Sequence, residues 1–199
     1  MQDKSGRRSN RERTEETRAA LLAAGRGLFV EQGYAGTGTP EIVKAANVTR
    51  GALYHHFRDK EDLFRAVVEQ EAKTVSAEIE RSANRAKSPL AALKEGSKAY
   101  FDAMAAPGRA RLLLLDGPAV LGPEEMSCID RETGGGSLLD GLAALFGEAA
   151  DGKMEALADM LSAAFDRGAL AIAHGRSLSD YETAMNRLLD ALAGTSPRA

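Results

Sequence analysis

Residues 39–60 constrain the fold of this chain more than any other segment, because helix-forming and turn-forming residues alternate there over a short distance. Thr39 and Pro40 are typical of a helix start, since Thr accepts from first-turn amides and Pro needs no amide partner there. Asn47 tolerates a left-handed backbone and can make a turn, after which Thr49 caps a second helix. The segment therefore predicts two short helices joined by a tight turn.

The second predicted helix has two different faces. Leu53 and Phe57 are four residues apart and share the face that packs on the first helix, whereas Gly51 and His55 point away from it. Gly51 and Ala52 have almost no side chain, so the outer face can approach another molecule closely. Such a helix fits the DNA major groove, where every base pair displays a distinct pattern of donors and acceptors.

Polar residues beside this face divide into base readers and phosphate clamps. Arg50 is long enough to reach a guanine, which is the commonest base-specific contact. Tyr54, His55 and Lys60 can donate to phosphates, and such contacts fix register rather than sequence. These residues predict specific binding to double-stranded DNA.

The order of residues is more specific than a helix-turn-helix alone. Gly33-Tyr34 precedes a Thr-rich start, Val-Thr-x-Gly-x-Leu-Tyr-x-His-Phe over 48–57, and Lys-Glu-x-Leu-Phe over 60–64. Across roughly residues 14–68 this resembles the N-terminal domain of tetracycline-repressor-like (TetR/AcrR) regulators. The resemblance implies DNA-backbone positions for Thr37 or Thr39 and Lys44, groove positions for Thr49, Arg50 and Ala52, and phosphate clamps at Tyr54, His55 and Lys60, which His56 supports.

Charge is unevenly distributed along the chain, although the total is only −3. Residues 1–60 contain 11 Lys and Arg against 7 acids, and the remainder contains 15 against 22. A basic module joined to an acidic one is expected of a DNA reader with a separate sensing domain. Residues 1–13 predict a disordered basic tail, which either keeps the chain soluble or contacts the DNA minor groove or phosphates.

Nearly every segment predicts helix, and no alternating strand pattern occurs. We expect an all-α protein with a three-helix DNA-binding domain over 14–59 and a helical regulatory and dimerisation domain over 60–199. Gly33 ends the first helix, and Asp116-Gly117-Pro118 is expected to break a short apolar segment. The remaining predicted helices are 60 into the eighties, 89–104, one after Pro123, 137–147, 152–174 and 178–193.

The last two predicted helices carry apolar residues at three- and four-residue spacing. This pattern fits an internal core, and it also fits a four-helix interface between two subunits. The resemblance favours a homodimer, and two recognition helices related by a two-fold axis would read a palindrome. The predicted interface comprises Leu157, Met160, Leu161, Ala164, Tyr181, Met185, Leu188, Leu189 and Leu192.

Apolar residues of the middle helices are sufficient to line a pocket, although an ordinary core needs the same residues. The resemblance implies that an apolar or mildly polar small-molecule effector binds there. The candidate lining residues are Tyr100, Phe101, Met104, Leu114, Val120, Met126, Phe146 and Phe165.

Two other classes of function remain as alternatives, a helical enzyme and a scaffold that does not bind DNA. The adjacent pair His55-His56 does not have metal-ligand spacing, and no nucleophile elbow or phosphate loop occurs, so we expect no catalytic residues, metal or cofactor. A regulator of this kind could also act as an activator or without an effector. The lack of an 18-residue apolar run and of a signal peptide predicts a soluble, cytoplasmic protein. The single Cys128 excludes an internal disulfide and a thiolate metal cluster.

Overall fold

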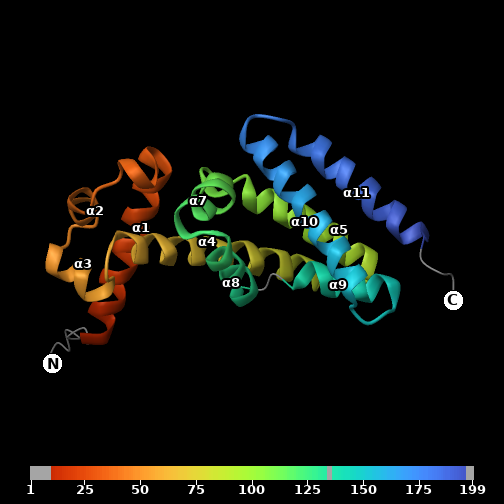
Figure 1. Ribbon diagram of the computed structural model, residues 1–199, viewed down its shortest axis with the longest axis horizontal. Coiled ribbons are helices and arrows are strands. Elements are labelled where there is room, and N and C mark those ends of the chain that lie inside the picture. Colours follow the sequence, from red (N-terminus) through yellow and green to blue (C-terminus); the bar gives the residue numbers. More distant parts are fainter. Residues whose placement is uncertain (1–9, 134–135, 196–199) are drawn as a thin grey trace, which may run out of the picture. The chain divides into compact units, whose positions relative to one another are not determined.

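The computed structural model describes residues 10–133 and 136–195, in which all regular structure is helical (Figure 1). The chain divides into two compact units, residues 1–67 and 68–199. The all-α expectation is therefore confirmed. In the described residues no helix combines the length and apolar character needed to span a bilayer.

The N-terminal unit packs three helices around the beginning of a fourth. They are α1 (Asn10–Gly36), α2 (Thr39–Ala45), α3 (Arg50–His56) and the first two turns of α4 (Lys60–Ala83). Phe29 and Phe64 are fully buried and meet edge to face with ring centroids 5.0 Å apart. Leu53 of α3 is fully buried as well, which fixes the orientation of the second motif helix.

Two predicted boundaries differ from the structure. Helix α1 begins at Asn10, so residues 10–13 are helical rather than part of a disordered tail, and residues 1–9 lie outside the described part of the chain. The boundary between the units falls after Val67 rather than at residue 60. The reason is that Leu63 and Phe64 of α4 belong to the buried core of the N-terminal unit.

Gly33 interrupts α1 as expected, because its φ of 74° is left-handed, but a further turn follows up to Gly36.

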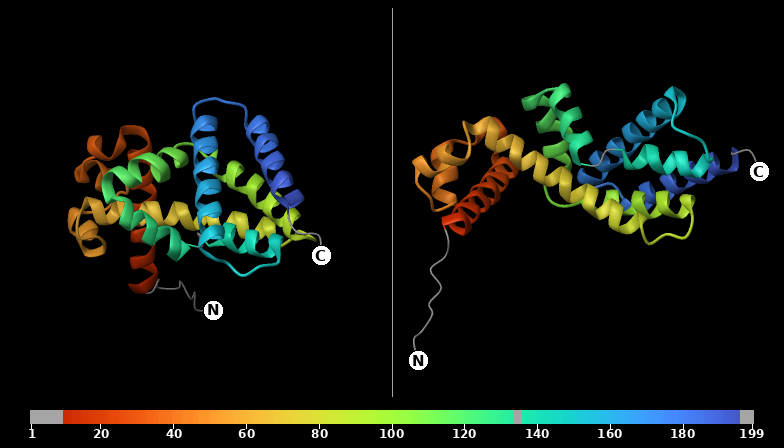
Figure 2. Two further views of the ribbon diagram at one scale, coloured as in Figure 1. Left: turned by 45° about the vertical axis from the view of Figure 1, so that its right-hand side comes forward. Right: turned by 90° about the horizontal axis from the view of Figure 1, so that it is seen from below.

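The C-terminal unit contains the second part of α4 and all later helices. These are α5 (Pro89–Met104), α6 (Arg109–Arg111), the π-helical turn η1 (Leu112–Asp116), α7 (Gly117–Leu121), α8 (Pro123–Thr133), α9 (Ser137–Phe146), α10 (Gly152–Ala173) and α11 (Leu178–Thr195). Helices α5, α10 and α11 remain neighbours in both views of Figure 2.

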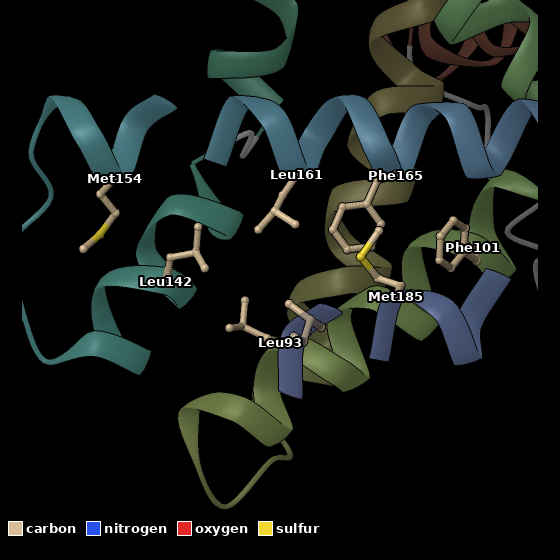
Figure 3. Packing of buried hydrophobic residues seen from close by; sticks show 8 residues of the cluster. Leu93, Phe101, Leu142, Met154, Leu161, Phe165 and Met185 are labelled. Carbon is tan, nitrogen blue, oxygen red and sulfur yellow. The ribbon is translucent and has the colours of Figure 1, made fainter. Parts of the chain in front are cut away.

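The core of this unit lies between α5, α9, α10 and α11 (Figure 3). Leu161 and Phe165 point from α10 toward Leu93 and Met185, and Phe101 lies beside them. Gly168 lets α10 approach α5 closely, since a Cβ there would lie only 2.8 Å from the Phe101 ring. Side-chain packing therefore joins the long C-terminal helices to α5.

The segment from Arg109 to Leu121 is helical throughout, so the expected break at residues 116–118 is wrong. Proline inside a helix removes one amide and clashes with the carbonyl four residues earlier. The π-helical turn accommodates Pro118 by wider spacing, in which the Gly117 amide donates to the Leu112 carbonyl.

Candidate nucleic-acid interface and effector cavity

The turn between α2 and α3 is built by local hydrogen bonds. Asn47 has a φ of 53°, which confirms its predicted left-handed conformation. Thr49 caps α3 as predicted, because its Oγ1 accepts from the amide of Ala52 at 3.2 Å. The cap of α2 is Gly38 rather than Thr39, and the Glu41 carboxylate accepts from the Gly38 amide at 3.0 Å.

The outer face of α3 is open to solvent. Arg50, Gly51 and His55 are exposed, Tyr54 is 44% exposed, and Ala52 is half-buried. Arg50 lies over the Tyr54 ring with its guanidinium carbon 5.5 Å from the centroid. This is the face that the sequence predicted to enter the DNA groove.

Tyr54 joins the two motif helices at this surface. Hydrogen bonds with Arg50 and with Thr39 lower the pKa of the Tyr54 phenol. Thr39 is the first residue of α2, so the phenol connects α2 to α3 beside the predicted reading face. Lys44 is exposed in the last turn of α2.

His56 is half-buried behind the exposed His55. Burial lowers the pKa of His56, and the charges of His55 and Arg18 lower it further. The lowered pKa favours an uncharged ring at neutral pH, which fits a supporting position better than a phosphate clamp.

Two residues predicted to touch DNA, Thr37 and Lys60, form side-chain hydrogen bonds within the N-terminal unit. Thr37 is buried, and its hydroxyl donates to the carbonyls of Gly33 at 2.8 Å and Leu28 at 3.2 Å, so its side chain is withdrawn from DNA. The Lys60 ammonium donates to the carbonyls of Tyr34 at 2.8 Å and Thr37 at 3.0 Å. Lys60 therefore holds the end of α1, and its contact with a phosphate stays a prediction.

The C-terminal unit contains a cavity of about 880 Å³, bordered by the second part of α4 and by α5, η1, α7, α8, α9 and α10. Ligand pockets usually have volumes of about 300–1,000 Å³. Five of the predicted residues line this cavity, namely Tyr100, Met104, Leu114, Met126 and Phe165.

Three predicted lining residues do not border the cavity. Phe101 is only 1% exposed and belongs to the core cluster, and Phe146 packs against that cluster. Val120 of α7 is partly buried, but the lining from this helix comes from Pro118. The apolar character of Phe101 and Phe146 is explained by helix packing rather than by a ligand.

The predicted dimer residues fall into three groups. Leu161, Met185 and Leu189 are buried in the chain's own core, so their side chains are unavailable to a partner subunit. Met160 and Leu188 are 73% and 49% exposed. The others are partly buried and pack against the core cluster; they are Leu157, Ala164, Tyr181 and Leu192.

Comparisons with known proteins agree with this arrangement. Residues 21–67 match the model for bacterial regulatory proteins of the tetR family, and residues 90–194 match a tetracyclin repressor-like C-terminal domain. A TetR-family transcriptional regulator from Pectobacterium atrosepticum has 31% sequence identity and a TM-score of 0.69, with 96% of this chain and 99% of that chain covered. The chain belongs to the TetR family.

Curated relatives match over part of their length. The regulator AcrR of Shigella flexneri is 38% identical over 108 residues, which cover 54% of this chain and 50% of AcrR. The repressor NemR of Escherichia coli is 39% identical over 61 residues, which cover 31% of each chain. The match thus spans about half the length of AcrR and less of NemR.

The main feature of this TetR-family chain that sequence reasoning missed is the acidic lining of the cavity. Glu80, Asp130, Asp140 and Asp166 all border it, and none was a predicted site residue. Their positions on four different helices give no local motif. In residues 10–133 and 136–195, no group of His, Cys, Asp or Glu is arranged to hold a metal ion.

Proposed function

We propose that this TetR-family chain is a homodimeric transcriptional repressor that binds a palindromic operator and releases it when a small effector occupies the cavity. The observation that carries the proposal is the exposed face of α3, where Arg50 and Tyr54 lie together beside the small residues Gly51 and Ala52. A protein with this function acts by recognising DNA and not as an enzyme, and it works in the bacterial cytoplasm, where the chromosome lies.

A few exposed or half-buried side chains are proposed to contact the operator. Arg50 is the proposed base reader, because guanidinium groups pair with guanine in the major groove. Lys44, Thr39, Tyr54 and His55 are the proposed backbone contacts, and they lie on α2 and α3. Thr49 acts through the cap that fixes the start of α3.

Dimerisation is proposed through α10 and α11. Met160 and Leu188 expose large apolar side chains, which a second copy of the chain would cover. A single short recognition helix contacts few base pairs, whereas two related by a two-fold axis read half-sites about 34–36 Å apart. The dimer therefore supplies the specificity that one subunit lacks.

Effector release is proposed to pass through α4. The first turns of this helix belong to the N-terminal unit, where Lys60 holds the end of α1. Its later turns, from Ala72 to Ala83, border the cavity. An effector that favours a different position of α4 would alter the distance between the two α3 helices, and operator DNA would weaken effector binding by the same factor.

The test is a band-shift titration with DNA from upstream of the protein's own gene, with mass determination of the complex. We expect a complex of two subunits per site that is lost steeply as salt rises. Failure to prefer any duplex over random DNA, at low salt, contradicts the proposed function. Increased transcription from the bound promoter would assign an activator instead.

A further inference from the structure

The wall of the cavity has an unbalanced charge. Four carboxylates border it, from Glu80 of α4, Asp130 of α8, Asp140 of α9 and Asp166 of α10. The described residues that line the cavity include no Lys, Arg or His. Arg131, whose guanidinium donates to the lining residue Ser127 at 2.8 Å, brings one positive charge near these four carboxylates. An anion placed in the cavity would therefore meet net negative charge, whereas a cation would reduce it.

Asp166 lies within a small aromatic group. The Tyr100 hydroxyl donates to its Oδ1 at 2.7 Å, which holds the carboxylate in place. The rings of Tyr100 and Phe165 lie 5.4 Å apart at their centroids, and both border the cavity. A carboxylate beside two aromatic rings can bind an organic cation by charge and by cation–π attraction at once.

No cation of the lining neutralises the partly buried Asp166. Burial raises its pKa, the Tyr100 hydrogen bond opposes that rise, and the nearby charge of Asp130 adds to it. The negative charges of Asp130 on α8 and Asp166 on α10 therefore repel each other at the cavity wall. A bound positive charge between them would relieve this repulsion.

A separate polar group also points to a ligand. Ser97 of α5 lines the cavity and is only 3% exposed. A serine hydroxyl can both donate and accept a hydrogen bond, so Ser97 offers a polar contact to a molecule bound in the cavity.

We propose that the cavity binds an organic cation with an aromatic or bulky apolar body, and that Asp166 is its main counter-ion. This deepens the proposed function, on which it rests, by naming the chemical class of the effector. It also narrows the class of effector expected from sequence, an apolar or mildly polar molecule, to organic cations. The negative charge of the wall favours a cation over neutral and anionic molecules.

The test compares two fluorescent probes of nearly the same shape, without DNA. These are 10-methylacridinium, a permanent cation, and acridine, which is uncharged at pH 8. We expect the cation to bind the full-length protein about ten- to a hundredfold more tightly, the range that a charge-assisted contact supplies. Equal or tighter binding of acridine, or binding of neither probe, overturns the proposal.

Variants locate the charge that selects the cation. Asp166→Asn is expected to reduce the preference to about twofold or less, and Asp130→Asn, at an exposed position, is expected to reduce it in part. Asp159→Asn removes an exposed carboxylate of α10 that does not line the cavity, and should leave the preference unchanged. Unchanged preference in both Asp166→Asn and Asp130→Asn overturns the proposal.

Operator binding by the same preparations separates this inference from the proposed function. A protein that shifts operator DNA but shows no cation preference remains a DNA-binding regulator, and only the effector class is wrong. A protein that prefers the cation but never binds DNA contradicts the proposed function and leaves the cation site standing.

Discussion

The Lys60 ammonium donates to the carbonyl of Tyr34 at 2.8 Å and lies 4.1 Å from the centre of the Tyr34 ring. With its second bond to the Thr37 carbonyl, it ties the start of α4 to the end of α1. Lysine near a helix C-terminus stabilises the carbonyl end of that helix. The relationship gives Lys60 a structural role inside the N-terminal unit, although the predicted DNA-binding domain ended at residue 59.

Replacing Lys60 with alanine is therefore expected to destabilise the protein before DNA is considered. The Tyr34 and Thr37 carbonyls would lose a shared charged donor that is partly exposed, which corresponds to about 1–2 kcal/mol of unfolding free energy. Urea denaturation of the DNA-free protein measures the change.

Lys44→Ala is the matched control for Lys60→Ala, because Lys44 is an exposed lysine of the same unit. We expect its unfolding free energy to stay within about 0.5 kcal/mol of the parent. Equal stability of the two variants would show that the Lys60 hydrogen bonds contribute nothing to the free energy of unfolding. The role left for Lys60 would then be phosphate binding, as predicted from the sequence.

Arg50→Ala is expected to change which operator is preferred. If Arg50 reads a guanine, its loss costs about 1–3 kcal/mol on the cognate half-site and much less on a site altered at that base pair. Lys44→Ala should weaken all duplexes alike and lower the salt slope by about one for each subunit. Binding to a panel of single-base operator variants measures both effects. If Arg50→Ala instead lost the same affinity for every operator variant, Arg50 would contact the DNA phosphate backbone rather than a base.

Local signals explain why so much of the fold was predictable. The cap at Thr49 and the turn at Asn47 depend on residues within a few positions, and both have the predicted geometry. The C-terminal helices could be bounded from Pro and Gly positions for the same reason. By contrast, the hydrogen bond from Lys60 to Tyr34 joins residues 26 apart, and no short motif encodes it.

Periodicity also does not tell what a buried face meets. Phe101 of α5 and Phe165 of α10 belong to the same aromatic cluster, and their ring centroids are 5.5 Å apart. Only Phe165 borders the cavity. Likewise Leu188 and Leu189 are adjacent, and Leu189 is buried while Leu188 is 49% exposed. Hydrophobic spacing marks the apolar face, whereas voids and subunit contacts depend on how whole helices pack.

Met160→Glu and Leu188→Glu are each expected to dissociate the proposed dimer. Both side chains are exposed on the DNA-free subunit, so the fold should tolerate a charge that an apolar interface does not. Sedimentation equilibrium should show monomers at micromolar concentration with an unchanged circular dichroism spectrum. Leu115→Glu, at a leucine 45% exposed on η1, is the matched control and should remain dimeric. If both interface variants remained dimeric, this face of α10 and α11 would not be the dimer interface.

Asp166→Asn is expected to stabilise the protein while it weakens cation binding. Burial raises the pKa of this carboxyl above its ordinary value of 3.8, and the charge of Asp130 raises it further. The folded state therefore binds the proton more tightly than the unfolded state, and wild-type stability falls as pH rises from 3.8 through the raised pKa. Asparagine cannot ionise, and its amide oxygen can still accept from the Tyr100 hydroxyl.

The stability difference should consequently depend on pH in one direction. The unfolding midpoint of Asp166→Asn should exceed that of the wild type at pH 7, and the gap should close as pH falls below the ordinary carboxyl pKa of 3.8. Thermal unfolding from pH 3 to pH 8 measures it, with Asp159→Asn as a control for removing one charge from α10. A gap that widens toward low pH would show that the carboxylate stabilises the fold, and the wall would then already contain its positive partner. A gap that closes, together with a lost cation preference, would show that the chain retains an unfavourable charge because its ligand needs it.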